Sequence, residues 1–396
     1  MSKIIIFCAD GTWNGPSEPD NENPTDPPTN VFKLFANLAG KDCSGSLMLG
    51  QEQERALVDA DGTVLQHAKY LHGVGDSSNY LVRLVGGTTG AGLIIRVIRG
   101  YTFISRNYQA GDRIFIIGFS RGAYTARAVG GMIASQGLLD ASRLDLDDRD
   151  NAYRLGAAVW YAYLRASKAS HPALLGGLQR YVLELPGFFS SVPPSTELVK
   201  APIDTVAVWD TVGALGIPDF NMQLSRVDLL QFADTKLSPV VLHGRHAISI
   251  DERRADFTPT LWDPDPRILQ ALFPGCHGDV GGGFAASESG LSDCALNWMT
   301  SQLTDLGVLF AAEPTFVANA SPIGTGHEPW TSPPWWLLPQ VARTFPAGLS
   351  LSRYAADRLA NGSVCAFPGG PAGVWCPTNL SGYLLGDTLA PGVEVM

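Results

Sequence analysis

A serine, a histidine and a carboxylate occupy positions in this chain that fit nucleophilic catalysis. Ser120 is the centre of Gly118-Phe119-Ser120-Arg121-Gly122, between an apolar run at 113–117 and a helix-forming run at 123–129. A G-x-S-x-G sequence between a strand and a helix is typical of a nucleophile elbow, in which a sharp turn lifts the serine hydroxyl above a parallel sheet. We therefore expect Ser120 to be a nucleophile. The alternative is a glycine-rich phosphate loop or an ordinary turn.

A serine nucleophile needs a histidine as its base. His277 lies in Phe273-Pro274-Gly275-Cys276-His277-Gly278-Asp279, directly after an apolar run that we interpret as a strand. A loop at the carboxyl end of a strand is where the base should stand, so we expect His277 to be the base and a surface turn histidine to be the alternative. His277 and Asp279 alone are weak support for a metal site, and we expect none. The other histidines after Ser120 are His171, His243, His246 and His327.

The carboxylate that orients the histidine has two candidates. Asp210 ends the apolar run at 205–209, and Asp251 ends the next run, at 247–250. The usual hydrolase order favours Asp251, whereas the order found in some lipases favours Asp210. Asp251 has Arg253 and Arg254 as local salt-bridge partners, but the residues after Asp210 are small and apolar. We expect Asp210 to be the acid and keep Asp251 as the alternative.

Backbone N–H groups must stabilise the oxyanion that forms when the serine attacks. One is expected from Arg121, the residue after the nucleophile. The other is expected from Gly11 or Thr12, which follow the apolar run at 4–7. A tight turn without a catalytic role is the alternative for this second segment.

The same segment also suggests haloacid-dehalogenase-like phosphatases, which have D-x-D-G-T after their first strand. In this chain Cys8 occupies the position of the nucleophilic aspartate, ahead of Asp10-Gly11-Thr12. A thiol forms no aspartyl-phosphate and does not replace that aspartate as a magnesium ligand. We therefore reject this class.

Composition limits the function further. The chain has 396 residues, 45% of them hydrophobic and 17% charged, and a net charge of −10. The negative charge argues against a nucleic-acid partner and against electrostatic docking on anionic lipid. The apolar run at 4–7 is too short for a signal peptide, so we expect a protein that is cytoplasmic or exported without one. The six cysteines have no zinc-site spacing, and the pairing of Cys365 with Cys376 is left open.

Apolar runs of strand length alternate with helical patterns, which predicts an α/β-hydrolase fold with a mostly parallel central sheet flanked by helices. We expect one domain over residues 1–396, with a helical cap inserted at 138–200 and an irregular Gly/Pro/Trp-rich extension at 314–396. The expected strands are 4–7, 64–71, 113–119, 205–210, 247–251 and 269–273. The expected helices are 93–108, 123–136, 153–166, 174–185, 291–309 and 351–359.

Taken together, these segments resemble the α/β-hydrolase domain of type VI secretion phospholipase effectors of the first lipase class, long catalogued as a domain of unknown function. The resemblance implies a serine esterase or phospholipase with Ser120 as nucleophile and His277 as base, and it leaves the choice of acid open. It also implies a secretion or immunity protein as a partner. The matching stretches are 9–14, 73–75, 111–127, 209–213, 246–253 and 273–283.

We therefore expect a serine hydrolase that cleaves carboxylic esters through an acyl-enzyme on Ser120, without a cofactor. Aromatic residues at 160–163 and 188–189 and the pair Trp335-Trp336 suggest a lipid or phospholipid acyl ester and a transient contact with a membrane surface. Packing in the core and the cap is the alternative role of these aromatics. The alternative functions are an esterase for soluble or polymeric esters and a non-catalytic interaction module with a hydrolase fold.

Overall fold

The computed structural model describes residues 2–11, 27–43, 52–72, 90–170, 195–212, 235–333, 335–337, 339–385 and 388–396, but not the side chains of 90–92 and 167–170. Its main sheet has the strand order β11-β10-β9-β8-β5-β1-β4-β3-β2. The strands are β1 (Ile4–Ala9), β2 (Lys41–Asp42), β3 (Glu52–Val58), β4 (Val64–Leu71), β5 (Arg113–Phe119), β8 (Ile203–Trp209), β9 (Val241–Ser249), β10 (Ile268–Phe273) and β11 (Ser350–Leu351).

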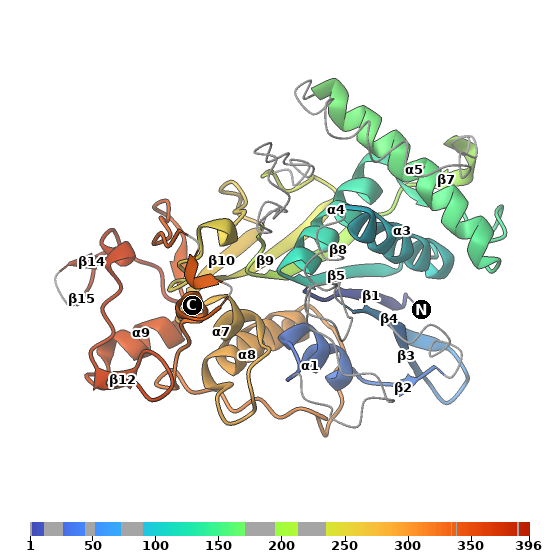
Figure 1. The fold of residues 1–396 in the computed structure, drawn as a ribbon. Coiled ribbons are helices and arrows are strands. Elements are labelled where there is room, and N and C mark those ends of the chain that lie inside the picture. The colour runs from blue at the N-terminus through green and yellow to red at the C-terminus, as the bar shows by residue number, and fades with distance from the viewer. Residues whose placement is uncertain are drawn as a thin grey trace.

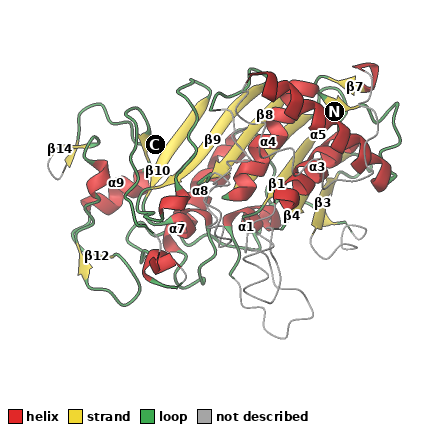
Figure 2. Cartoon of the chain, turned by 45° about the horizontal axis from the view of Figure 1, so that its top comes forward, coloured by secondary structure: helices red, strands yellow, loops and turns green. Residues whose placement is uncertain are grey.

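The strands from β11 to β4 are parallel, whereas β3 and β2 are antiparallel to their neighbours. Strands β1 and β8 are buried along their whole length, and their continuous apolar sequences are typical of strands covered on both faces. Because the strands are parallel, β1, β5, β8, β9 and β10 end at one edge of the sheet (Figure 2). The candidate catalytic residues follow these ends.

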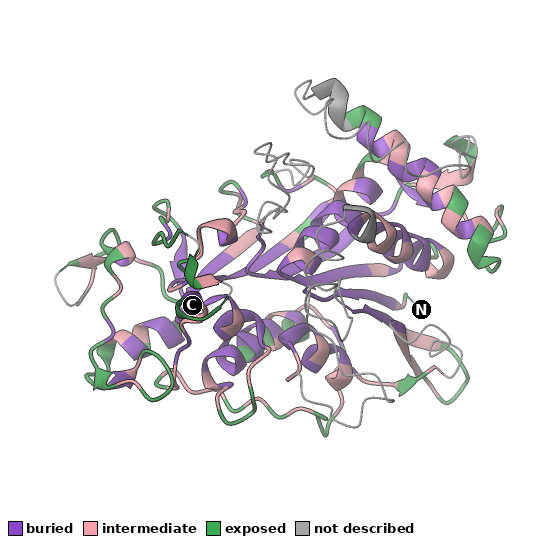
Figure 3. Cartoon of the chain, viewed as in Figure 1, coloured by how far each residue is buried: buried purple, intermediate pink, exposed green. Residues whose placement is uncertain are grey.

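Helices cover both faces of the sheet (Figure 1). On one face lie α3 (Gly90–Asn107), α4 (Arg121–Gln136) and α5 (Arg149–Ser170), and on the other lie α1 (Asn30–Asn37), α7 (His277–Gly281), α8 (Gly290–Asp305) and α9 (Arg353–Ala360). Each face has its own buried apolar cluster, and buried residues concentrate along the sheet and the inner sides of the helices (Figure 3). This is an α/β fold with a mostly parallel central sheet flanked by helices, as predicted.

The inserted region that we predicted as a cap begins and ends with the two strands of a small antiparallel sheet. Its strand β6 (Leu138–Leu139) pairs antiparallel with β7 (Leu198–Val199). Between them, α5 packs on the outside of α3 and α4. Trp160 and Tyr163 lie in the buried cluster beneath α5, so these two aromatics have the packing role that we kept as the alternative. The helix expected at 174–185 and the aromatics at 188–189 lie outside the described residues.

The C-terminal extension is more regular than its composition predicts. It adds β11 to the edge of the main sheet, beside β10. Leu349, Leu351 and Ala355 of the extension share a buried cluster with Ile248 and Leu272 of the central strands. Residues 349–355 are thus part of the main core. Cys365 and Cys376 are both free thiols. Among the described residues, no helix is both long and apolar enough to cross a membrane.

Candidate active site

The turn between β5 and α4 has the geometry that its glycines predict. Ser120 has φ 58° and ψ −123°, a conformation that non-glycine residues rarely adopt. Its backbone N–H donates to the carbonyl of Trp209 at 3.1 Å. A Cβ atom at Gly118 would overlap the carbonyl of Gly122, and one at Gly122 would overlap the carbonyl of Ala9. Only glycine therefore fits at both positions of this strained turn.

His277 lies beside this turn. It is the first residue of the five-residue helix α7, so the expectation that it would stand in a loop was wrong. The imidazole ring of His277 lies 4.6 Å, between centroids, from the ring of Phe119, the residue before Ser120. A Cβ atom at Gly281 would overlap the Phe119 ring. The ring of Phe257 contacts His277 edge-on, at 5.0 Å between centroids. Gly281 thus allows α7 to pack directly against Phe119, the last residue of the strand that leads to Ser120.

Asp210 is the aspartate that contacts His277. Its Oδ2 lies 2.5 Å from His277 Nδ1, and its Oδ1 accepts the backbone N–H of Ser249 at 3.0 Å. The guanidinium of Arg343 donates to both oxygens, from Nη1 to Oδ1 at 2.7 Å and from Nη2 to Oδ2 at 2.9 Å. Asp210 is fully buried and has a φ of 37°. Among the described non-glycine residues, only Asp210 and Ser120 have a positive φ.

These contacts determine the charges of the pair. Burial raises the pKa of the Asp210 carboxyl, but the charge of Arg343 and the hydrogen bond from His277 outweigh burial and hold that pKa well below its usual range. Burial lowers the pKa of His277, and the bond to Asp210 only partly offsets this, so the pKa of His277 lies below its ordinary value. An ionised carboxylate only accepts, so Nδ1 of a neutral His277 carries the proton and Nε2 keeps its lone pair. A neutral imidazole with a basic Nε2 is suited to accept a proton from a hydroxyl.

Asp251 is engaged elsewhere. Its Oδ2 accepts the backbone N–H of Gly275 at 2.6 Å, and both carboxylate oxygens lie 3.1 Å from Nε1 of Trp375. Burial raises its pKa to about 6, although these hydrogen bonds lower it. Within the described part of the chain, no hydrogen bond or ion pair joins Asp251 to His277. Among the described residues, Asp251 forms neither of the local salt bridges expected with Arg253 and Arg254, and Arg254 pairs with Glu252.

Glu252 is a site residue that the sequence reasoning missed. Its side chain is fully buried. Its Oε2 accepts the backbone N–H of His277 at 3.2 Å and a hydrogen bond from Nη2 of Arg254 at 2.7 Å. The Asp251-Glu252-Arg253-Arg254 sequence shows only two acidic residues followed by two basic ones, and the buried contact with His277 depends on the fold. Glu252 thus fixes the backbone of the histidine from the adjacent strand end.

A second histidine–aspartate pair anchors α7. Asp279 Oδ1 lies 2.7 Å from Nδ1 of His327, and Asp279 Oδ2 accepts the backbone N–H groups of Cys276 and His327, each at 2.9 Å. The ring of His327 stacks on Phe284 at 3.5 Å between centroids. Asp279 therefore binds an amide of its own loop, as its sequence position suggests. The contact with His327 in the C-terminal extension was not foreseen.

The segment after β1 approaches the serine closely. A Cβ atom at Gly11 would lie 3.3 Å from Cβ of Ser120, so Gly11 is next to the nucleophile turn. The N–H of Gly11, however, donates to Oδ1 of Asp10 at 2.6 Å. That carboxylate is itself held by the hydroxyls of Tyr70 and Thr29, at 2.5 and 2.7 Å from Oδ2. Gly11 thus provides close approach, and its N–H is bonded to Asp10 in this structure; its role as an oxyanion donor stays a prediction.

The structure describes only one of the two other residues that we expect to supply an oxyanion donor. Arg121 is the first residue of α4 and directly follows Ser120. Thr12 lies outside the described residues. Of these two residues, the structure therefore describes the position of Arg121 alone, and its role as an oxyanion donor stays a prediction.

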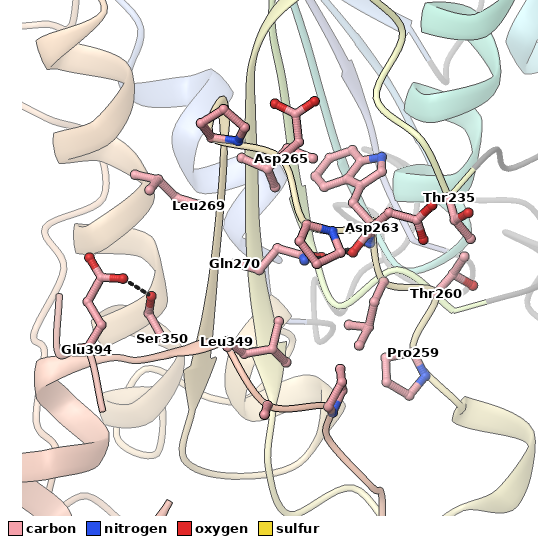
Figure 4. Close-up of a pocket in the computed structure, with 18 residues that line it drawn as sticks. Thr235, Pro259, Thr260, Asp263, Asp265, Leu269, Gln270, Leu349, Ser350 and Glu394 are labelled. Atoms are coloured by element: carbon pink, nitrogen blue, oxygen red, sulfur yellow. Dashed lines mark hydrogen bonds between the residues drawn. The ribbon is translucent and has the colours of Figure 1, made fainter. Parts of the chain in front are cut away.

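The structure contains a cavity of about 890 Å³ beside β10 (Figure 4). Its walls are residues 259–266, the first half of β10 and residues 346–350, together with Thr235 and Glu394. The segment 259–266 follows Phe257, which contacts His277, and the segment 346–350 follows Arg343, which binds Asp210. None of Ser120, Asp210 and His277 lines the cavity. It adjoins the supports of the site and is not the site itself.

Comparison with known proteins places the chain among relatives that are longer than itself. It is 28% identical over 271 residues to a Saccharomyces cerevisiae protein described as "Uncharacterized protein YEL023C", which covers 67% of this chain and 33% of the relative. Two solved structures are similar, with TM-scores below 0.4. One is an uncharacterized protein from Pseudomonas aeruginosa, at 16% identity and TM-score 0.39, covering 78% of this chain and 46% of the other.

The second structure is that of "the Tle1 effector bound to the VgrG spike from the Type 6 secretion system", at 18% identity and TM-score 0.36, covering 74% of this chain and 53% of the other. The chain thus spans about a third of its yeast relative and about half of each solved structure. A family model described as "T6SS, Phospholipase effector Tle1-like, catalytic domain" matches residues 3–302. Because this match covers well over half of the sequence, the chain belongs to the Tle1-like catalytic domain family of type VI secretion phospholipase effectors.

Proposed function

We propose that this protein is a serine hydrolase of the α/β-hydrolase type that cleaves lipid acyl esters, with phospholipids as its substrates. The observation that carries the proposal is the 2.5 Å contact between Asp210 and His277, formed beside the strained turn of Ser120. Membership of the phospholipase effector family supports a lipid ester as the substrate and export as an effector.

The reaction follows from the charges of the site. Nε2 of His277 removes the proton of Ser120 Oγ as that oxygen attacks the ester carbonyl carbon. Backbone N–H groups of Arg121 and of Gly11 or Thr12 stabilise the oxyanion that develops. His277 then gives its proton to the leaving alcohol as the carbon–oxygen ester bond breaks, which leaves an acyl group on Ser120. Water, deprotonated by His277, hydrolyses this acyl-enzyme, and Asp210 stabilises the imidazolium formed in each half of the cycle.

A serine-directed phosphonate probe tests the mechanism. We expect it to label the wild-type protein at Ser120, as located by peptide mass spectrometry, and to leave Ser120→Ala unlabelled. Hydrolysis of p-nitrophenyl esters should fall by at least about 1,000-fold in Ser120→Ala, because the nucleophile is lost. Ser105→Ala is a matched control, because Ser105 is a buried serine in α3. Equal labelling or equal activity of wild type and Ser120→Ala would contradict the proposal and favour a non-catalytic module.

The lipid substrate is tested separately. We expect phosphatidyl substrates in mixed micelles to be cleaved with a higher kcat/KM than p-nitrophenyl acetate, with fatty acid released. If activity is confined to short, soluble esters, Ser120 is still a catalytic nucleophile but the protein is a non-lipid esterase.

A further inference from the structure

Arg343 joins the C-terminal extension to the candidate site. This residue lies beyond the family match, which ends at residue 302, and its side chain is buried. Besides its two bonds to Asp210, it donates from Nη1 to the carbonyl of Ser249 at 2.8 Å and from Nη2 to the carbonyl of Phe257 at 2.5 Å. The guanidinium of Arg343 thus connects three groups around His277. They are the carboxylate of Asp210, the last residue of β9 and the backbone of Phe257, whose ring contacts His277.

The geometry of this contact restricts how Asp210 is oriented. A guanidinium is a planar fork, and two parallel bonds to one carboxylate fix both the plane and the position of that carboxylate. With Oδ1 also held by the N–H of Ser249, rotation of the Asp210 side chain would break several hydrogen bonds. Oδ2 therefore stays directed at Nδ1 of His277, which sets the direction of Nε2 on the other side of the ring.

The charges around the pair give Arg343 a second effect. Three charged groups lie around the Asp210–His277 pair: Glu252 and Arg254 compensate each other, and Arg343 compensates Asp210. His246, which accepts the N–H of Thr211 at 3.2 Å, has a pKa lowered by burial to about 3 and is neutral. With Asp210 already compensated by Arg343, a proton on His277 would add an uncompensated charge in a buried site. Arg343 therefore favours the neutral imidazole.

We propose that Arg343 is a positioning residue for the Asp210–His277 pair, and that its charge extends the activity of the enzyme to lower pH. The proposal rests on the serine hydrolase function proposed above. It also makes the C-terminal extension a structural contributor to the catalytic site.

Two substitutions separate the positioning role of Arg343 from the effect of its charge. Arg343→Met removes both the fork and the charge, so we expect kcat to fall roughly 100-fold with KM within about threefold, because a misplaced base slows chemistry and Arg343 touches no substrate. The acid limb of kcat/KM should move to higher pH by about one unit, since Asp210 would then favour the imidazolium more strongly. Arg343→Lys keeps the charge, so its acid limb should stay at the wild-type pH while its kcat falls.

Arg358→Met is the matched control, because Arg358 is an equally buried arginine of the same extension that donates to the carbonyls of Pro322, Gly324 and Cys365. It should lose stability without moving the acid limb. Folding of each variant is checked by near-ultraviolet circular dichroism, and the titration of the His277 imidazole by NMR provides a readout that does not depend on turnover.

The outcomes are distinguishable. A wild-type protein that hydrolyses no ester overturns the proposed function and this inference with it. An active wild type with an unchanged kcat and acid limb in folded Arg343→Met overturns this inference alone. An equal shift in Arg358→Met attributes the effect to general destabilisation and also overturns it. If Arg343→Met does not fold, Arg343→Lys decides: a wild-type kcat in that variant contradicts the positioning role.

Discussion

At the scale of single residues, Asp210 and Asp251 are two aspartates at neighbouring strand ends that differ in burial and in their partners, since Asp210 is fully buried and Asp251 is half-buried. Asp210 is bonded to a histidine and an arginine, which keep its pKa low. Asp251 is bonded to neutral N–H donors, and burial raises its pKa to about 6. A carboxylate bonded to Nδ1 of the histidine can stabilise an imidazolium, and by this criterion we propose Asp210 as the acid.

Paired asparagine substitutions test this assignment. We expect Asp210→Asn to reduce kcat by about 1,000-fold or more, because an amide neither fixes the productive histidine tautomer nor balances the imidazolium charge. Asp251→Asn should keep kcat within a few-fold, since an amide oxygen can still accept the bonds from Gly275 and Trp375. The measurement is steady-state hydrolysis of a soluble ester by variants shown to be folded. The reverse order of effects would transfer the role of the acid to Asp251.

At the scale of elements, the packing of α7 against β5 depends on Gly281. The Phe119 ring occupies the space that a side chain at 281 would need, and the same ring contacts His277. This contact links the helix that carries His277 to the strand that leads to Ser120. Displacing α7 by even a fraction of an ångström should therefore alter the approach of His277 to Ser120.

We expect Gly281→Ala to lower kcat by roughly 10- to 100-fold, because positioning of the base deteriorates, and to destabilise the fold by about 1–3 kcal/mol through overpacking. Gly373→Ala is the control, since a Cβ atom there meets nothing within 4 Å. Thermal unfolding and ester hydrolysis are measured together. Adding Phe119→Leu to Gly281→Ala should recover part of the stability. A Gly281→Ala protein with wild-type activity and melting temperature would show that α7 tolerates displacement.

The elements differ in how far the sequence predicted them. The central strands and the helices α3, α4, α5 and α8 were anticipated because their apolar patterns are continuous and their packing is local. Helix α7 was missed because a five-residue segment with two glycines has little intrinsic helix propensity, and Asp279 stabilises it through its bond to the N–H of Cys276. Strand β3 was missed because its sequence, EQERALV, is mostly polar. These are cases in which tertiary contacts outweigh local preference.

At the scale of the whole molecule, the candidate site combines parts that the sequence predicts unequally. Ser120, Asp210 and His277 all follow strand ends, and the parallel order of the sheet brings strand ends together. Arg343 and His327 come from a segment without periodicity, and their partners lie 133 and 48 residues away in sequence. No local pattern encodes such long-range buried pairs, so the core of the site was predictable and its outer supports were not.

The C-terminal extension should therefore behave as part of the main core, although the family match ends at residue 302. Leu351 is fully buried in β11, in a cluster with Ile248 and Leu272 of the central strands. Leu351→Ala is expected to lower the free energy of unfolding by about 2–5 kcal/mol through the cavity it leaves. Val374→Ala is the control in the same extension, because Val374 is 70% exposed, and its effect should stay within about 0.5 kcal/mol.

Denaturant titration followed by both circular dichroism and ester hydrolysis measures these changes and their cooperativity. If the extension and the sheet are one unit, the two signals should show one transition, shifted equally by Leu351→Ala. An earlier transition confined to part of the circular dichroism signal, with hydrolysis retained through it, would mean that the extension unfolds separately. In that case the contact between Arg343 and Asp210 is dispensable for catalysis, because separation of the extension removes Arg343 from the site.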